Sequence, residues 1–105
     1  MIAGFIASGS TQVVVRGLGP TLAQFRVSGA LADPALCLVD SNGTIVRGNN
    51  NWKDSQQVAI QATGLAPSDD LEAAIITTVA AGNYTAILSG NGGATGIGLV
   101  EIYKL

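Results

Sequence analysis

Short runs of β-branched and aliphatic residues alternate along the chain with polar segments rich in glycine, asparagine, aspartate and serine. Such runs are typical of β-strands, and the segments between them carry residues that favour turns. The pattern predicts seven strands, over residues 2–7, 11–16, 35–40, 44–47, 72–79, 84–89 and 97–104. Seven short strands in 105 residues favour two packed antiparallel sheets over one open sheet.

One helix is predicted between the fourth and fifth strands. Asp54 and Gln57 have the spacing of a capping box at its start, and Gly64 is a natural stop at its end. The apolar residues that share one face of this helix are Val58, Ala59 and Ala62. We therefore expect a single domain over residues 1–105. Its fold would be an all-β, antiparallel two-sheet β-sandwich (jelly-roll-like) of seven or eight strands, with one short helix near residues 54–63 that closes one end.

Several predicted strands carry apolar residues on both of their faces. Successive side chains of a strand point to opposite faces of a sheet. Ile87 alternates with Ala86 and Leu88 in the sixth strand, and Cys37 and Val39 alternate with leucines in the third. If the alternating partners face the core, these three residues lie on an outer face. The outer face of a free sandwich is usually polar, so we expect another molecule to cover this one.

The composition agrees with a covered subunit. Charged residues make up 11% of the chain and hydrophobic residues 48%, whereas ordinary soluble domains carry about 25% charged residues. The net charge is -2, and the five basic residues are scattered, so nucleic-acid binding is not expected. No apolar run approaches the roughly 20 residues that span a bilayer, so no membrane span is expected.

The sequence offers little for catalysis. It has no histidine, which removes the commonest general base and the usual partner of a Ser or Cys nucleophile. Cys37 is the single cysteine and is interpreted as a small apolar strand residue. The glycine loop at residues 17–20 lacks the Gly-Lys-Ser/Thr ending of a phosphate-binding loop. The acidic residues at positions 69, 70 and 72 are expected to be solvated around a turn. We expect no enzymatic activity and no cofactor.

The stretch VDSNGTIVRGNNNW has two interpretations, a calcium loop or a β-hairpin. Oxygen ligands for calcium would come from Asp40, Asn42, Asn50 and Asp54, but only two of these are carboxylates, so binding would be weak. The hairpin is favoured, because Asn-Gly between two apolar runs is a strong turn signal, and Asp40 can bond the turn backbone. Calcium remains the alternative.

The order of motifs carries a resemblance. The segments VVVRGLGPTL, GALADPALCLVDSNGTIV, NNNW, IQATGLAP, EAAIITTV, AGNYTAILSG and TGIGLVEIYKL follow one another as in a domain that recurs in large secreted and cell-surface bacterial proteins. Residues 36–103 also resemble, more loosely, the bacterial pre-peptidase carboxyl-terminal β-sandwich. Both resemblances imply a non-catalytic, extracellular sandwich used for attachment or assembly. They also lead us to expect an acid in the amide run before Trp52, where this chain has three asparagines.

The favoured function is a non-enzymatic extracellular or cell-surface structural or adhesive protein that self-assembles into a filament or surface polymer. The first strand is apolar and can pair with an edge of its own sheet or of a neighbour's; both pairings are open. The residues expected to mediate assembly are Ile2, Phe5, Ile6, Cys37, Val39 and Ile87. The alternative is an accessory module of a secreted protein that binds calcium or a surface glycan. For carbohydrate, Trp52 favours a core plug over a stacking platform, because one isolated aromatic is a poor sugar site.

Overall fold

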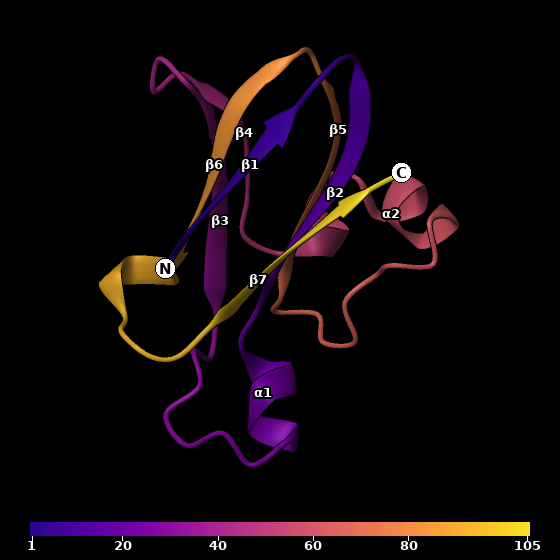
Figure 1. Cartoon of the computed structure of the whole chain (residues 1–105). Coiled ribbons are helices and arrows are strands. Elements are labelled where there is room, and N and C mark those ends of the chain that lie inside the picture. Colours follow the sequence, from indigo (N-terminus) through magenta and orange to yellow (C-terminus); the bar gives the residue numbers. More distant parts are fainter.

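Seven antiparallel strands in two sheets make up the computed structural model, which describes residues 1–105 (Figure 1). The four-stranded sheet contains, in spatial order, β1 (Ile2–Ala7), β6 (Gly82–Gly90), β3 (Pro34–Asp40) and β4 (Ile45–Asn49). The three-stranded sheet contains β5 (Ala73–Val79), β2 (Thr11–Leu18) and β7 (Leu99–Lys104). The predicted antiparallel sandwich of seven strands is confirmed, and each predicted strand end lies within about two residues of the observed one.

The main core lies between the two sheets and is built from alternate strand positions. Its buried side chains come from both sheets and, at Leu31, from the segment between α1 and β3: Ala7, Val13, Val15, Leu31, Leu36, Leu38, Ala73, Ile75, Val79, Ala86 and Leu88. Cys37 lies between two core leucines in β3, and Ile87 lies between two core residues in β6. Both side chains therefore point away from the core. The predicted alternation in β3 and β6 is therefore confirmed.

A second, smaller core covers the far face of the three-stranded sheet. Val14, Ala74 and Ile76 point away from the main core and are buried under Trp52 and Ile60. Trp52 is 4% exposed, and its Nε1 donates to the Asp69 carbonyl at 3.2 Å. Trp52 is thus a buried plug, as predicted. The apolar second face of this sheet is covered by residues of the same chain.

The helices differ from the prediction in number and in their starting points. Two short α-helices are present, α1 (Pro20–Gln24) and α2 (Gln57–Ala62), with 3-10 turns η1 (Trp52–Asp54) and η2 (Asn91–Gly93). The prediction of one helix was wrong because Pro20 starts α1 directly after the glycine loop, a favoured first position for proline. No helix is long or apolar enough to cross a membrane.

The predicted start and buried face of α2 were also wrong. Asp54 belongs to η1, and α2 is capped at Gln56 with no side-chain capping bond, since the Gln56 amide is bonded to β5 instead. With this shorter helix, Ile60 is the residue that packs on the sheet, while Val58 is 81% exposed. The stop is confirmed: Gly64 follows the helix with a φ of 74°, a conformation that glycine adopts readily.

The β3–β4 connection is the predicted hairpin. Gly43 N–H donates to the Asp40 carbonyl at 3.0 Å, and Asp40 Oδ1 accepts the backbone N–H groups of Asn42 (2.9 Å) and Thr44 (3.0 Å). Gly43 has a φ of 78°, whereas Asn42 does not adopt a positive φ. Next to the turn, the pairing of β3 with β4 shifts at a bulge between Leu38 and Val39. Asp40 therefore stabilises the turn backbone, as expected for the hairpin interpretation.

Candidate self-assembly surface

The first strand pairs within its own sheet. β1 lies antiparallel to β6 over its whole length, from the pair Ile2–Ile87 to the pair Ala7–Gly82. The terminal amine of Met1 donates to the Leu88 carbonyl at 3.0 Å, and Leu88 N–H donates back to the Met1 carbonyl at 2.8 Å. Of the two pairings that the sequence left open, the structure contains the one with the chain's own sheet.

Strand register brings most of the predicted assembly residues together on one surface, the side of the four-stranded sheet that faces away from the core. We call this surface the outer face. The residues on it are Ile2, Gly4 and Ile6 of β1, Asn83, Thr85, Ile87 and Ser89 of β6, Ala35, Cys37 and Val39 of β3, and Ile45 and Gly48 of β4. Ile2, Ile87 and Cys37 form one continuous cross-strand row. The sequence did not single out Ile45, which lies opposite Val39.

The outer face carries no charged residue at any of these positions. Ile2, Ile6 and Ile45 are 71%, 67% and 66% exposed, so they project into solvent. Burying an isoleucine side chain is worth about 1.5–3 kcal/mol, so three exposed isoleucines on a charge-free sheet favour contact with another surface.

Phe5 does not belong to the outer face. It alternates with Gly4 and Ile6, so its ring points to the core side of β1 and packs against the main core. The ring stacks on Tyr84 of β6 with centroids 5.4 Å apart. Phe5 therefore holds β1 against β6. It contributes to assembly only indirectly, by keeping β1 in place.

The edges of the two sheets differ in how much free backbone they present. At β5, the Gln56 side chain bonds both the N–H and the C=O of Ile76, and Asn49 Oδ1 accepts the Ala74 N–H at 3.1 Å. These side chains close the β5 edge. β4 is irregular, because a bulge shifts its pairing with β3, and it carries Arg47. Both features discourage edge-to-edge pairing.

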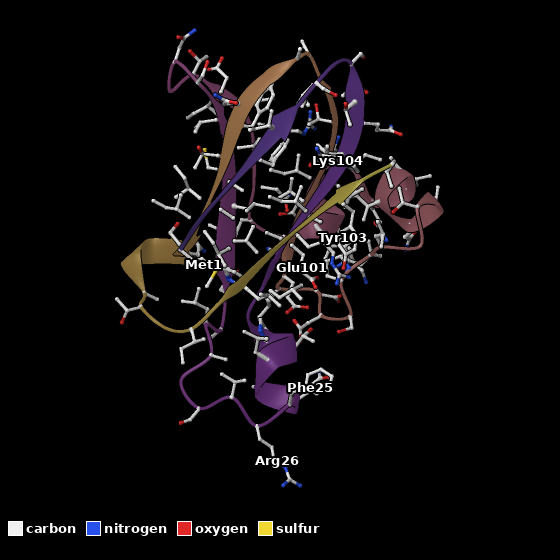
Figure 2. All side chains as sticks on the ribbon, viewed as in Figure 1. Met1, Phe25, Arg26, Glu101, Tyr103 and Lys104 are labelled. Carbon is white, nitrogen blue, oxygen red and sulfur yellow. The ribbon has the colours of Figure 1, made fainter.

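The other two edges, β1 and β7, lie on the same side of the sandwich. Lys104, near the end of β7 (Figure 2), reaches across and donates from Nζ to the Ile6 carbonyl of β1 at 2.7 Å. Phe25 and Arg26 project at the end of α1, away from both edges (Figure 2). Although Phe25 is 76% exposed, it is a single apolar side chain of the kind that surfaces normally tolerate.

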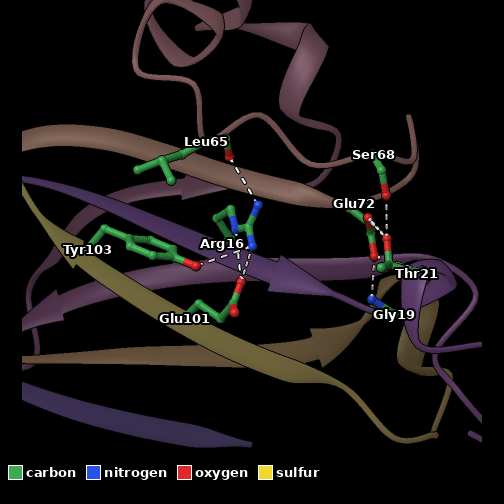
Figure 3. Close-up of polar contacts among 8 residues, drawn as sticks. All are labelled: Arg16, Gly19, Thr21, Leu65, Ser68, Glu72, Glu101 and Tyr103. Atoms are coloured by element: carbon green, nitrogen blue, oxygen red, sulfur yellow. Dashed lines mark hydrogen bonds and ion pairs between the residues drawn. The ribbon is translucent and has the colours of Figure 1, made fainter. Parts of the chain in front are cut away.

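One acidic residue was misjudged from the sequence. Glu72 is not solvated around the turn but fully buried, directly before β5. Its Oε2 accepts the backbone N–H groups of Gly19 (3.0 Å) and Thr21 (2.9 Å), and its Oε1 accepts the Thr21 hydroxyl (Figure 3). The glycine loop therefore binds an anion of its own chain. The Gly-Pro helix start was the sequence signal for free N–H groups, but nothing in the spacing identified their partner.

A second polar cluster lies on the far face of the three-stranded sheet. The Arg16 guanidinium of β2 pairs with Glu101 of the neighbouring β7 and donates to the Leu65 carbonyl at 3.3 Å (Figure 3). It also lies over the Tyr103 ring, 5.4 Å from the centroid. These bonds tie the segment after α2 to the sheet.

The four calcium candidates are not brought together. Asp40 and Asn42 lie at the hairpin tip, while Asn50 lies at the opposite end of β3, roughly 20 Å away, where its side-chain amide lies beside Asp33 and the Pro34 carbonyl. Asp54 lies on η1. No group of three or more acidic, histidine or cysteine side chains is placed to hold a metal ion. Asn51 Oδ1 is buried without a hydrogen-bond partner, but a calcium ion takes six to eight oxygens.

No protein-family model, curated protein or solved structure matches the chain.

Proposed function

We propose that the chain is a non-enzymatic, extracellular structural or adhesive protein that assembles with copies of itself into a filament or surface polymer. The observation that carries the proposal is the outer face of the four-stranded sheet, on which no charged residue lies and three isoleucines are at least 66% exposed. Such a face has nothing to repel a second copy, and each isoleucine buried there stabilises the contact.

The two sheets of this molecule support the proposal by contrast. The far face of the three-stranded sheet also carries apolar residues, and there Trp52 and Ile60 cover them. On the outer face of the four-stranded sheet, Ile2, Ile6 and Ile45 remain 71%, 67% and 66% exposed, so the chain leaves them uncovered. A partner molecule would cover the outer face in the same way as η1 and α2 cover the far face of the three-stranded sheet.

The chemistry of the ionisable groups supports a structural role. The buried carboxylate of Glu72 is bonded to the start of α1, and the half-buried Arg16 is paired with Glu101. Trp52 is covered and bonded through its indole nitrogen, so its ring offers no surface for stacking a sugar. Glu72, Arg16 and Trp52 are thus engaged in holding the fold.

The extracellular location rests on the resemblance of motif order, from VVVRGLGPTL to TGIGLVEIYKL, to domains of secreted and cell-surface proteins. It is tested by labelling intact producing cells with an antibody to the chain. Surface labelling supports the location, and labelling only after cell lysis contradicts it.

Self-assembly is tested on the purified chain by light scattering over a range of concentrations, followed by electron microscopy. The mean mass should rise above 10.6 kDa with concentration. Because the contact is apolar, about 0.5 M sodium chloride should not dissolve it, and sodium sulfate should strengthen it. Microscopy should show open polymers. A chain that stays monomeric at every concentration contradicts the proposal.

A further inference from the structure

The free backbone of β1 is well defined by its pairing with β6. Met1 and Leu88 exchange both of their backbone hydrogen bonds. In an antiparallel pair, bonded and non-bonded residues alternate, so Ala3, Phe5 and Ala7 also bond β6. Ile2, Gly4 and Ile6 consequently direct their N–H and C=O groups away from the sheet. Apart from the Ile6 carbonyl, which accepts one bond from Lys104 Nζ, these groups are free to bond a further strand.

We propose that β1 pairs with β1 of a second copy, antiparallel about a two-fold axis at Gly4, so that two four-stranded sheets join into one. The inference rests on the proposed self-assembly and names one of its contacts. In this register Gly4 faces Gly4 of the second copy, and Ile2 faces Ile6. Each facing pair exchanges both of its backbone bonds.

The sequence of β1 fits such a self-complementary pairing. The free groups at Ile2 and Ile6 are equally spaced on either side of Gly4, as a two-fold axis requires. β1 has no charged residue, whereas β4 carries Arg47 and β7 carries Glu101 and Lys104, and charges on an edge discourage pairing.

The Lys104 contact is compatible with the pairing. Lys104 Nζ uses the Ile6 carbonyl, but a carbonyl oxygen has two lone pairs and can accept a second donor from the neighbouring copy. At the axis itself, Gly4 presents no side chain. A Cβ added there would approach only the Tyr84 carbonyl, at 3.6 Å, so the position tolerates small substitutions.

The pairing extends the outer face from one copy into the next. Ile6 of one copy would lie beside Ile2 of the other. Ile2 is the first residue of the cross-strand row that contains Ile87 and Cys37. A two-fold contact closes on itself and gives a dimer. If a second two-fold contact, between outer faces, offsets each dimer by one copy, the edge contact and the face contact together give an open polymer.

The test compares Gly4→Pro with Gly4→Ala. Proline removes the Gly4 N–H that bonds across the axis, while alanine keeps it and adds a Cβ. We expect the alanine variant to polymerise like the parent chain and the proline variant to stop at dimers joined by their outer faces. A proline variant that is folded by circular dichroism and polymerises like the alanine variant overturns the edge pairing and leaves the proposed function standing. A parent chain that never associates overturns both.

Hydrogen exchange of the parent chain decides the case if the proline variant does not fold. The amides of Ile2, Gly4 and Ile6 should exchange at least tenfold more slowly in the assembled chain than in dilute solution. Equal exchange in the two states, with the chain assembled, overturns the pairing.

Discussion

Gln56 bonds the backbone of Ile76 with both ends of its side-chain amide: Nε2 donates to the carbonyl at 2.8 Å, and Oε1 accepts the N–H at 3.1 Å. The side chain thus occupies the position of a neighbouring strand at the β5 edge. We expect Gln56→Ala to lower the free energy of unfolding by about 1–3 kcal/mol, because both backbone groups of Ile76 lose their partner.

Chemical denaturation measures the loss, with Gln61→Ala on the exposed side of α2 as the control. Hydrogen exchange of the Ile76 amide gives a local readout. If that amide exchanges equally slowly in the Gln56 variant, the edge is protected by something other than Gln56.

The buried carboxylate of Glu72 stabilises the start of α1. Glu72→Gln replaces one acceptor oxygen with an NH2 group that faces donors, so we expect a loss of about 1–3 kcal/mol in the free energy of unfolding. The matched control is Asp70→Asn. Asp70 forms only an exposed ion pair with Lys53 at 2.8 Å, which should be worth less than about 1 kcal/mol. Equal losses in the two variants would contradict the assigned role of Glu72.

The environment of Trp52 can be read directly, since it is the only tryptophan in the chain. Its emission should be blue-shifted in the folded protein and move to that of free tryptophan on unfolding, because the ring is 4% exposed. Trp52→Ala should cost about 3–5 kcal/mol. Trp52→Phe, which keeps a ring but loses the bond to the Asp69 carbonyl, should cost less. Folded protein with water-like emission contradicts the second core.

The hairpin turn depends on the left-handed conformation of Gly43. A side chain at a positive φ costs about 1–2 kcal/mol, so Gly43→Ala should be destabilising by that amount. Gly48→Ala on β4 is the control, since its Cβ would meet only the Leu36 carbonyl at 3.6 Å. Thermal unfolding compares them. A Gly43 variant as stable as the Gly48 variant contradicts the described turn.

The strands and the hairpin were predictable from the sequence because their signals are local. Alternation places Leu38 opposite to Cys37 within β3, and Leu88 opposite to Ile87 within β6, without knowledge of any neighbour, and Asn-Gly marks a turn by itself. The buried role of Glu72 and the engagement of Gln56 were not predictable. Both depend on contacts with residues that lie 20 or more positions away, and their polar side chains suggest solvent or a helix cap.

The outer face could be predicted only in part, because alternation within a strand is local whereas strand order is not. Cys37, Val39 and Ile87 follow from alternation, but their alignment with Ile2 and Ile45 requires the strand order of the sheet. The far face of the three-stranded sheet also carries apolar residues, but Trp52 and Ile60 cover them. Coverage is a tertiary property that periodicity alone cannot reveal.

The central claim is that the outer face is the assembly surface. Sedimentation velocity of two variants, Ile87→Lys and Val58→Lys, tests it most directly. Both variants add one positive charge, the first at the centre of the outer face and the second at an 81% exposed position on α2. Val58→Lys should polymerise like the parent chain. Ile87→Lys should form nothing larger than a dimer, because two facing lysines would be buried without partners. If the folded Ile87 variant polymerises as the Val58 variant does, the outer face is not the assembly surface.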